Sequence, residues 1–327
     1  MSTILCPQQL ESDQDYSLRP SFLKEFIGQT NIKSNLLVFL DSAKKRNEPL
    51  DHCLFYGPPG LGKTTLAQII AKEMNVNIKT TSAPALVKTA DLAGILMNLK
   101  RGEILFIDEI HRMRIALEEM LYSAMEDLKL DLAIGQGSTA RIARVDLAHF
   151  TLVAATTRLG LISNPLRSRF PISLRLELYS TEELHTVLAR AAMMLKLNCS
   201  SDGLTEIAMR SRGTPRIALR ILRRVRDFAI VENIQSTNVS YVQQILAKME
   251  IDGLGLDSND HRYLQFIYNN YNGGPVGLET IASGLNETKD SIEETIENYL
   301  IRIGFVNKTT KGRQLTHHAI NYLLKKL

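Results

Sequence analysis

Residues 57–65 read GPPGLGKTT, and this stretch decides the fold class of the chain. Its three glycines carry no side chains, so backbone N–H groups of the loop can converge on phosphate oxygens. Lys63 would add a positive charge between the β- and γ-phosphates, and the hydroxyl of Thr64 could bind Mg²⁺. The stretch therefore predicts a loop that binds the phosphates of ATP together with Mg²⁺. The glycines are Gly57, Gly60 and Gly62.

The flanks of this loop predict a strand before it and a helix after it. Residues 52–56 are apolar, and residues 64–73 have the spacing of an amphipathic helix whose N-terminus would face the anion. Further apolar stretches alternate with helical segments, which is typical of a mainly parallel sheet with nucleotide at the carboxyl ends of its strands. The further strands are expected at 76–79, 103–107 and 150–155.

An acidic motif, ILFIDEIHR at 104–112, ends one of these strands in two carboxylates. Asp108 is placed to hold Mg²⁺ through water, and Glu109 to polarise an attacking water. An acidic pair after a strand can also be a helix cap, and a glycine loop can be an ordinary turn. The two motifs together favour ATP hydrolysis.

Two later residues extend this site. Thr157 ends the strand at 150–155, where it could act as a polar sensor of the γ-phosphate or be an ordinary strand end. The motif PLRSRF at 165–170 places two arginines beside a short turn. Arg169 is the better candidate for a finger that reaches the nucleotide of a neighbouring subunit.

Length and pattern predict three domains, because 327 residues exceed one ordinary core. Residues 1–180 are expected to form the α/β domain. Residues 181–254 are expected to form a small helical domain with helices at 181–196, 202–211, 214–232 and 237–248. The third domain, 255–327, begins within a glycine-rich stretch, IDGLGLDS at 251–258, that we expect to be flexible. Residues 260–327 predict three helices and a basic strand pair, which together form a winged helix.

A third arginine begins a helix of the second domain. In GTPRIA at 213–218, Thr214 is a good N-cap and Pro215 a good first helical residue, so Arg216 would project from the helix start. If the second domain is a lid, Arg216 could touch the γ-phosphate and couple hydrolysis to lid rotation.

The wing of the last domain is the predicted DNA contact. The helix before it, 288–304, is expected to expose acids that phosphate would repel, whereas the wing carries cations and no nearby acid. We expect sequence-independent binding of duplex DNA by the wing, although a merely solvated hairpin stays open. The expected acids are Asp290, Glu293, Glu294 and Glu297, and the cations are Lys308, Lys311 and Arg313.

A protruding β-hairpin is predicted where residues 128–145 alternate apolar and polar on both sides of a GQGS turn. Its outer arm presents an apolar strip flanked by cations. The hairpin could dock a partner, fold back on its domain or make ring contacts. The residues of the strip are Arg141, Ile142, Arg144 and Val145.

The composition indicates the cellular compartment in which the protein is expected. Three isolated cysteines, Cys6, Cys53 and Cys199, suit neither zinc nor disulfides and favour a reducing cytosol. No apolar run approaches the roughly 18 residues of a membrane span. The N-terminal stretch carries acidic residues, whereas a signal peptide would carry basic residues there. A cytoplasmic protein with no membrane association is expected. The net charge is only +4, but it is unevenly distributed, because residues 301–327 have six Lys or Arg and no acid. This end of the chain is therefore expected to bind a polyanion.

Taken together, these motifs resemble AAA+ ATPases and, more closely, the RuvB family of bacterial Holliday-junction branch-migration motors, from Leu18 to about Thr316. The motifs that carry the resemblance are LRPSFLKEFIGQ, GPPGLGKTT, ILFIDEIHR, EDLKLDLAIGQG, ATTR, PLRSRF, GTPRIALR and GFVNKTTKGR. The resemblance implies an ATP- and Mg²⁺-dependent homo-hexamer that encircles duplex DNA at Holliday junctions. It also implies roles in recombination, DNA repair and the SOS response. A RuvA-like junction-binding partner, docked on the hairpin, and a RuvC-like resolvase would be its partners.

The resemblance also implies roles for individual residues. Adenosine would be contacted by Leu18, Arg19, Ile27 and Tyr179. The phosphates would be bound by Gly60 to Thr65, a range that includes Gly62, Lys63 and Thr64, and the γ-phosphate also by Arg216. Arg169 would act in trans, with Glu126, Asp127 and Leu128 near the shared subunit boundary. The sequence departs from the family twice: Lys308 replaces an arginine of the wing, and Leu128 replaces an aromatic residue.

Two other classes compete with a DNA-translocating ATPase. A clamp loader or replication-initiation switch would more often carry a Ser-Arg-Cys finger and end in a helical collar, whereas this chain has Ser-Arg-Phe and a winged helix. A DNA-binding scaffold with a vestigial nucleotide site would not need the complete set of charged residues that this chain has at its predicted ATP site. Sustained ATP turnover stimulated by duplex DNA would distinguish the translocating ATPase from both.

Overall fold

The computed structural model describes residues 18–134 and 141–325; the side chains of 132–142 lie outside the description as well. The chain divides into two compact units. One comprises the residues up to Val187 together with Thr214–Arg216, and the other comprises Leu188–Gly213 and the residues from Ile217 onward. The described helices include none that is long and apolar enough to cross a bilayer.

The first unit is built on a five-stranded parallel sheet with the order β2-β3-β6-β1-β7. All four predicted strands are present within a few residues of their expected bounds. Edge strand β7 was not predicted, because its four residues alternate between buried and exposed positions and give no continuous apolar signal. The strands are β1 Cys53–Tyr56, β2 Ile78–Ser82, β3 Ile104–Asp108, β6 Thr151–Thr156 and β7 Ile172–Arg175.

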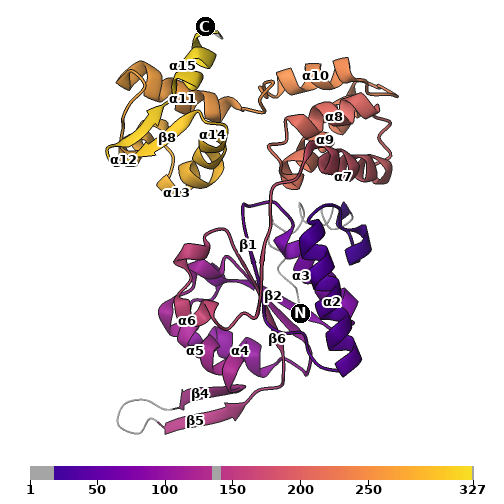
Figure 1. The fold of residues 1–327 in the computed structure, drawn as a ribbon, viewed down its shortest axis with the longest axis vertical. Coiled ribbons are helices and arrows are strands. Elements are labelled where there is room, and N and C mark those ends of the chain that lie inside the picture. The colour runs from indigo at the N-terminus through magenta and orange to yellow at the C-terminus, as the bar shows by residue number, and fades with distance from the viewer. Residues whose placement is uncertain (1–17, 135–140, 326–327) are drawn as a thin grey trace. The chain divides into compact units, whose positions relative to one another are not determined.

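Helices cover both faces of this sheet (Figure 1), so its central strands are apolar on both sides. Leu105 and Ile107 of β3 pair in register with Leu152 and Ala154 of β6, and all four are fully buried in one cluster with residues of α4 and α5. This packing fixes the strand ends that carry the acidic motif. The helices of this unit are α2 Thr30–Arg46, α3 Lys63–Met74, α4 Thr89–Met97, α5 Ile115–Glu126 and α6 Asn164–Arg167, with 3₁₀ turns at Leu23–Glu25, Ala83–Ala85, Ile110–Arg112 and Leu159–Leu161.

The predicted β-hairpin is confirmed. Strands β4 (Lys129–Ile134) and β5 (Arg141–Asp146) pair antiparallel and project beyond α4 and α5 in Figure 1. The base of the hairpin is anchored, because Leu130 is buried in the core and the N–H of Leu147 donates to the carbonyl of Leu128 over 2.7 Å.

The helical segment after the sheet also has the predicted elements. Helix α9 begins at Pro215, directly after Thr214, and buries one apolar face. The helices are α7 Thr181–Met194, α8 Ser201–Met209, α9 Pro215–Val231 and α10 Val239–Lys248.

The last segment is a winged helix, as predicted, with one more helix than expected. Helix α15 (His317–Leu324) follows the wing and was not predicted, because it is short and opens with two histidines. The Thr316 hydroxyl caps it, and it buries Ala319 and Leu323. The other elements are α11 Ser258–Tyr271, α12 Leu278–Leu285, a continuous helical stretch of α13 Lys289–Ser291, π-helix Ile292–Glu297 and α14 Asn298–Arg302, and wing strands β8 Val306–Thr309 and β9 Gly312–Leu315.

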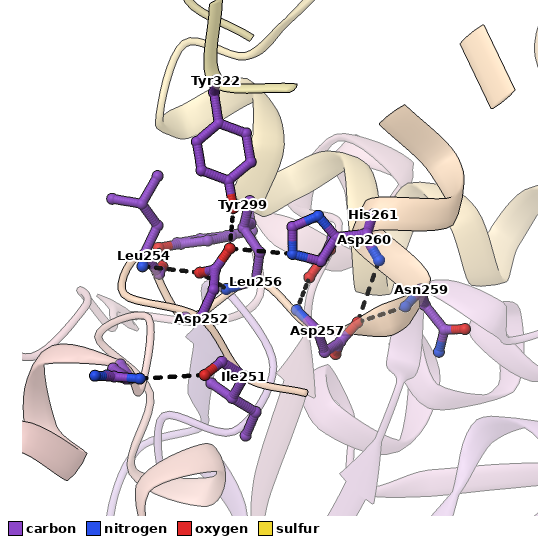
Figure 2. A network of polar contacts seen from close by, with 12 residues as sticks. Ile251, Asp252, Leu254, Leu256, Asp257, Asn259, Asp260, His261, Tyr299 and Tyr322 are labelled. Carbon is purple, nitrogen blue, oxygen red and sulfur yellow. Dashed lines mark hydrogen bonds and ion pairs between the residues drawn. The ribbon is translucent and has the colours of Figure 1, made fainter. Parts of the chain in front are cut away.

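The expected flexibility of IDGLGLDS is wrong, because Asp252 organises this stretch (Figure 2). Its carboxylate accepts hydrogen bonds from the N–H groups of Leu254 (2.8 Å) and Leu256 (2.9 Å), a local turn that Asp side chains favour. It also accepts from Tyr322 and lies 3.1 Å from the Nε2 atom of His261. Contacts from two later helices therefore fix the stretch.

A buried ion pair also holds the stretch 252–260 in place. The guanidinium of Arg212, with 10% of its side chain exposed, donates to Asp260 over 2.5 Å and to the carbonyl of Gly255 over 2.7 Å. Asp260 is 1% exposed, and burial raises the pKa of its carboxyl to about 7 although Arg212 favours the ionised form. The chain before α9 is thus joined to the start of α11.

Candidate functional site

The predicted phosphate loop has the backbone that its glycines allow. Gly57, Gly60 and Gly62 have φ values of 139°, 78° and 102°, which residues with a side chain rarely adopt. A Cβ atom on Gly57 would lie 2.4 Å from the carbonyl oxygen of Leu176. Both the conformation and the close approach therefore require glycine.

Lys63 lies inside this loop at the first position of α3. Only 8% of the residue is exposed, and its Nζ atom donates to the carbonyls of Gly57 (2.7 Å) and Pro58 (2.8 Å). Burial lowers the pKa of Lys63 to about 8; the nearby Asp108 opposes this shift and Arg216 adds to it. Three residues from distant parts of the sequence thus share one electrostatic environment. Thr64 and Thr65 follow in the first turn of α3.

The acidic motif lies at the carboxyl end of β3, as predicted. The N–H of Glu109 donates to Oδ1 of Asp108 over 2.9 Å, and Glu109 adopts a left-handed backbone with φ of 50°. Its carboxylate is half exposed and lies 3.1 Å from Arg112. Among the described residues, the Glu109 side chain is therefore held by this surface pair alone.

The neighbouring strand end contains a contact that sequence reasoning missed. Thr156, which is 1% exposed, lies 3.0 Å from Nδ1 of His111 and accepts from the N–H of Arg158 over 3.0 Å. This hydroxyl joins the end of β6 to the turn after the acidic motif. Thr157, the predicted sensor, follows it and is partly exposed.

Of the residues assigned to adenosine, Tyr179 lies beside the phosphate loop. Tyr179 is 7% exposed, its hydroxyl donates to the carbonyl of Leu61 over 3.3 Å, and burial raises its pKa. A Cβ on Gly28 would lie 2.7 Å from the Tyr179 ring, so Gly28 allows this contact. Leu18 is buried, whereas Arg19 and Ile27 are half-buried.

Two further residues in this region were not predicted. Phe26 packs against the phosphate loop, since a Cβ on Gly62 would lie 3.1 Å from its ring. Gln29 donates to the carbonyl of Glu177 over 2.6 Å and accepts from its N–H over 3.1 Å. Both fall within LRPSFLKEFIGQ, one of the motifs that carry the family resemblance.

Arg216 lies against the phosphate loop, as its predicted contact with the γ-phosphate requires. Its N–H donates to the carbonyl of Gly60 over 3.4 Å, and a Cβ on Gly60 would lie 2.9 Å from the Arg216 Cβ. The start of α9 is therefore in contact with the loop that would hold the phosphates.

Arg169 lies elsewhere, beside the end of α5. Its guanidinium donates to Glu126 (2.5 Å) and to the carbonyl of Pro165 (2.8 Å) and lies over the ring of Tyr122 at 5.1 Å. Its Nε is buried and has no hydrogen-bond partner in the part of the chain that the structure describes. Glu126, assigned to the same subunit boundary, is therefore its direct partner. Asp127 is exposed, and Leu128 packs on the core.

The wing departs from the prediction. The expectation that no acid lies near its cations is wrong, because Glu293 and Glu297 pair with both Lys308 and Arg313. Glu297, expected on the exposed face of its helix, is fully buried. Lys311 is exposed at the turn and makes no ion pair within the described part of the chain.

The hairpin strip is described only in part. Arg144 makes two hydrogen bonds to Asp131, of 2.8 and 3.0 Å, and both side chains are exposed. Val145 is half-buried. The side chains of Arg141 and Ile142 lie outside the described residues, so their contribution to the strip stays a prediction.

These residues fit a magnesium nucleotide. Among the described residues there is no group of three His, Cys, Asp or Glu side chains that could hold a metal alone. Mg²⁺ would therefore need phosphate oxygens in addition to Thr64 and Asp108, which is how phosphate-loop proteins hold it. The start of α3 and the two cations Lys63 and Arg216 supply the matching positive charge.

Comparison with known proteins agrees with this geometry. Residues 18–176 match the RuvB P-loop domain of Holliday junction DNA helicases, 179–252 the RuvB AAA lid domain, and 253–324 the RuvB C-terminal winged helix domain. The Holliday junction branch migration complex subunit RuvB of Rickettsia africae is 57% identical over 99% of this chain and 94% of its own. The same subunit of Orientia tsutsugamushi, strain Boryong, is 56% identical over 95% of this chain and 96% of its own.

Solved structures show the same likeness. The Thermotoga maritima RuvB Holliday junction branch migration motor superimposes with a TM-score of 0.86 at 47% identity, covering 94% of this chain and 98% of that one. A point mutant of the same protein gives a TM-score of 0.87 with the same coverage. On its sequence, its three matched regions and its fold, the chain belongs to the RuvB family of AAA+ P-loop ATPases.

Proposed function

We propose that this chain is an ATP-driven motor that moves duplex DNA through Holliday junctions, working as one subunit of a branch-migration complex. The observation that carries the proposal is the convergence of Lys63, Asp108 and Arg216, which come from three separate motifs, at one phosphate loop. The relatives named for branch migration are more than half identical to this chain over almost its whole length, which supports branch migration as its activity.

Each residue of the site would have a separate role in hydrolysis. Lys63 and the loop N–H groups would hold the β- and γ-phosphates, while Thr64 and Asp108 would hold Mg²⁺, which neutralises developing phosphate charge when bound. Glu109 would orient the attacking water, and its exposed pair with Arg112 leaves it able to turn. Thr157 would report the γ-phosphate from the adjacent strand end.

Arg216 would couple hydrolysis to movement of the lid. Arg216 is the second residue of α9, the long helix of the lid, and its backbone N–H donates to the phosphate loop. A contact between its guanidinium and the γ-phosphate would exist only before phosphate is lost. Loss of that contact would release the start of the helix, and a conformational step of this kind can drive translocation.

The assembly would be a homo-hexamer in which Arg169 completes the site of a neighbour. The pair between Arg169 and Glu126 is support for this role, because it holds the guanidinium at the end of α5 rather than at the phosphate loop of its own subunit. Division into an ATPase domain (1–180), a lid (181–254) and a winged helix (255–327) is part of the proposal, as is a cytoplasmic location.

The projecting hairpin would dock the junction-binding partner, a RuvA-like protein, and a RuvC-like resolvase would join the same complex. Within the described residues, β4 and β5 pair with each other and with no other strand, and the Arg144–Asp131 pair keeps polar groups on one face. A strip of apolar residues and cations at its outer arm would then be available to a partner.

A four-way junction assay tests the proposal. The wild-type chain with a RuvA-like partner, ATP and Mg²⁺ should convert a synthetic Holliday junction into two duplexes. Glu109→Gln should bind ATP and the junction without converting it, because the phosphate contacts remain and only the water-orienting carboxylate is lost. Conversion by Glu109→Gln at the wild-type rate, or none by the wild type, would overturn the proposal.

A further inference from the structure

The helical stretch before the wing holds a carboxylate whose burial the sequence did not predict. Glu297 is fully buried, and its Oε1 atom accepts from the hydroxyl of Tyr263 (2.9 Å) and from Nε of Arg313 (2.8 Å). Its Oε2 atom accepts from Nη2 of Arg313 (3.2 Å) and lies 3.1 Å from Nζ of Lys308. Both oxygens of Glu297 are thus occupied by groups of the winged helix itself.

A second carboxylate shares the same two cations from a more open position. Oε1 of Glu293 lies 3.0 Å from Nη2 of Arg313 and 3.1 Å from Nζ of Lys308. Its side chain is 31% exposed, whereas that of Glu297 is not exposed at all. The four residues carry two positive and two negative charges, so the cluster as a whole is neutral.

The two cations are held differently. The Arg313 side chain is only 15% exposed, and its backbone exchanges two hydrogen bonds with Val276, of 2.7 and 2.9 Å. Its hydrogen bond to Glu297 raises its pKa. The Lys308 side chain is 44% exposed and contacts the cluster through one flexible ammonium group. Arg313 is therefore fixed in place, and Lys308 is able to leave.

We infer that Glu293 is an affinity-tuning residue of the wing, which competes with DNA phosphate for Lys308 and the outer edge of Arg313 while Glu297 holds Arg313 in place. The inference rests on the proposed role of the wing in DNA binding and assigns it a mechanism. Duplex DNA would displace the half-exposed Glu293 carboxylate and leave the buried Glu297 pair intact.

This exchange has a measurable consequence for salt dependence. Each phosphate that a protein cation neutralises releases counterions and adds roughly 0.9 to the slope of log affinity against log salt. A cation that is already paired must lose its carboxylate before it pairs with phosphate, and the displaced carboxylate remains near the DNA, so the surface presents less net charge and fewer counterions are released. The wing should bind DNA more loosely, and with a shallower slope, than its three cations would alone.

The test compares Glu293→Gln with a matched control in the full chain. Duplex affinity would be measured by fluorescence anisotropy from 50 to 200 mM salt, with Mg²⁺ and a non-hydrolysable ATP analogue. The control is Glu287→Gln, because Glu287 is exposed near the start of the same helical stretch and accepts from the hydroxyl of Ser291 over 3.1 Å rather than from a cation of the wing. Both variants remove one negative charge.

Glu293→Gln should bind duplex about three- to tenfold tighter and steepen the slope by roughly one unit, while the control changes neither. Adding Lys308→Ala should remove most of this gain, because the freed ammonium provides it. An unchanged affinity in Glu293→Gln, or an equal gain in the control, would overturn the inference. If Lys308→Ala and Lys311→Ala both leave wild-type binding unchanged, the DNA-binding role of the wing fails first, and the inference fails with it.

Discussion

Lys63 should take up a proton when nucleotide binds above pH 8. Burial lowers its pKa to about 8 in the free protein, with a further lowering from Arg216 that Asp108 opposes. The negative charge of a bound triphosphate favours the ammonium form and so raises this pKa. Because the pKa is lower in the free protein than in the complex, binding takes up protons and weakens as the pH rises through 8.

The size of the effect follows from the pKa. At pH 9 about one Lys63 side chain in eleven is charged in the free protein, so nucleotide should bind about tenfold more weakly than at pH 7. At pH 8.5 about three quarters of a proton should be taken up per nucleotide bound. The phosphates do not contribute, because a terminal phosphate with a pKa of about 6 is already ionised.

Titration calorimetry in buffers of different ionisation enthalpy would measure this proton uptake with a non-hydrolysable analogue and Mg²⁺. Lys63→Arg is the control, because a guanidinium stays charged throughout this pH range and its binding should not change between pH 7 and 9. A wild-type affinity that is flat from pH 7 to 9, with no proton uptake, would show that Lys63 is fully charged in the free protein.

Three further predictions follow from buried or shared charges. Arg169→Ala should bind ATP yet hydrolyse it roughly 10³-fold more slowly, and mixing it with Lys63→Ala should restore turnover; no restoration in proven mixed rings would contradict a shared site. Arg313→Met should destabilise the winged helix by about 2–4 kcal/mol, since it strands a buried carboxylate, whereas Lys311→Met should change stability by less than about 0.5. Equal urea or hydrogen-exchange stability of these two would refute the wing cluster. Arg212→Met should lower the protection of the amide groups around 252–260 from hydrogen exchange. Unchanged protection there would show that the ion pair of Arg212 does not hold this stretch in place.

Features fixed by local chemistry could be predicted from the sequence. The positive φ values of Gly57, Gly60 and Gly62 follow from a loop in which only glycine fits, and the strands beside it are continuous apolar runs. Thr214 and Pro215 marked the start of α9 to the residue. These signals lie within a few residues of the feature they predict.

Features that depend on distant partners could not be predicted. Asp252 lies in a glycine-rich stretch that looks flexible until His261 and Tyr322 meet its carboxylate. Glu297 looks exposed on a regular helix, but it lies in a π-helix turn, where the 3.6-residue period fails, and its partner Arg313 comes from a later strand. In both cases the burial of a charge is decided by residues far along the chain.

The central claim is that this chain couples ATP hydrolysis to duplex DNA, and steady-state ATP turnover with and without duplex tests it most directly. The wild type should hydrolyse ATP continuously and faster when duplex is added, while Glu109→Gln should bind ATP and show neither basal nor stimulated turnover. A single turnover per site, or turnover that duplex leaves unchanged, would contradict a translocating motor and favour an ATP-dependent assembly switch.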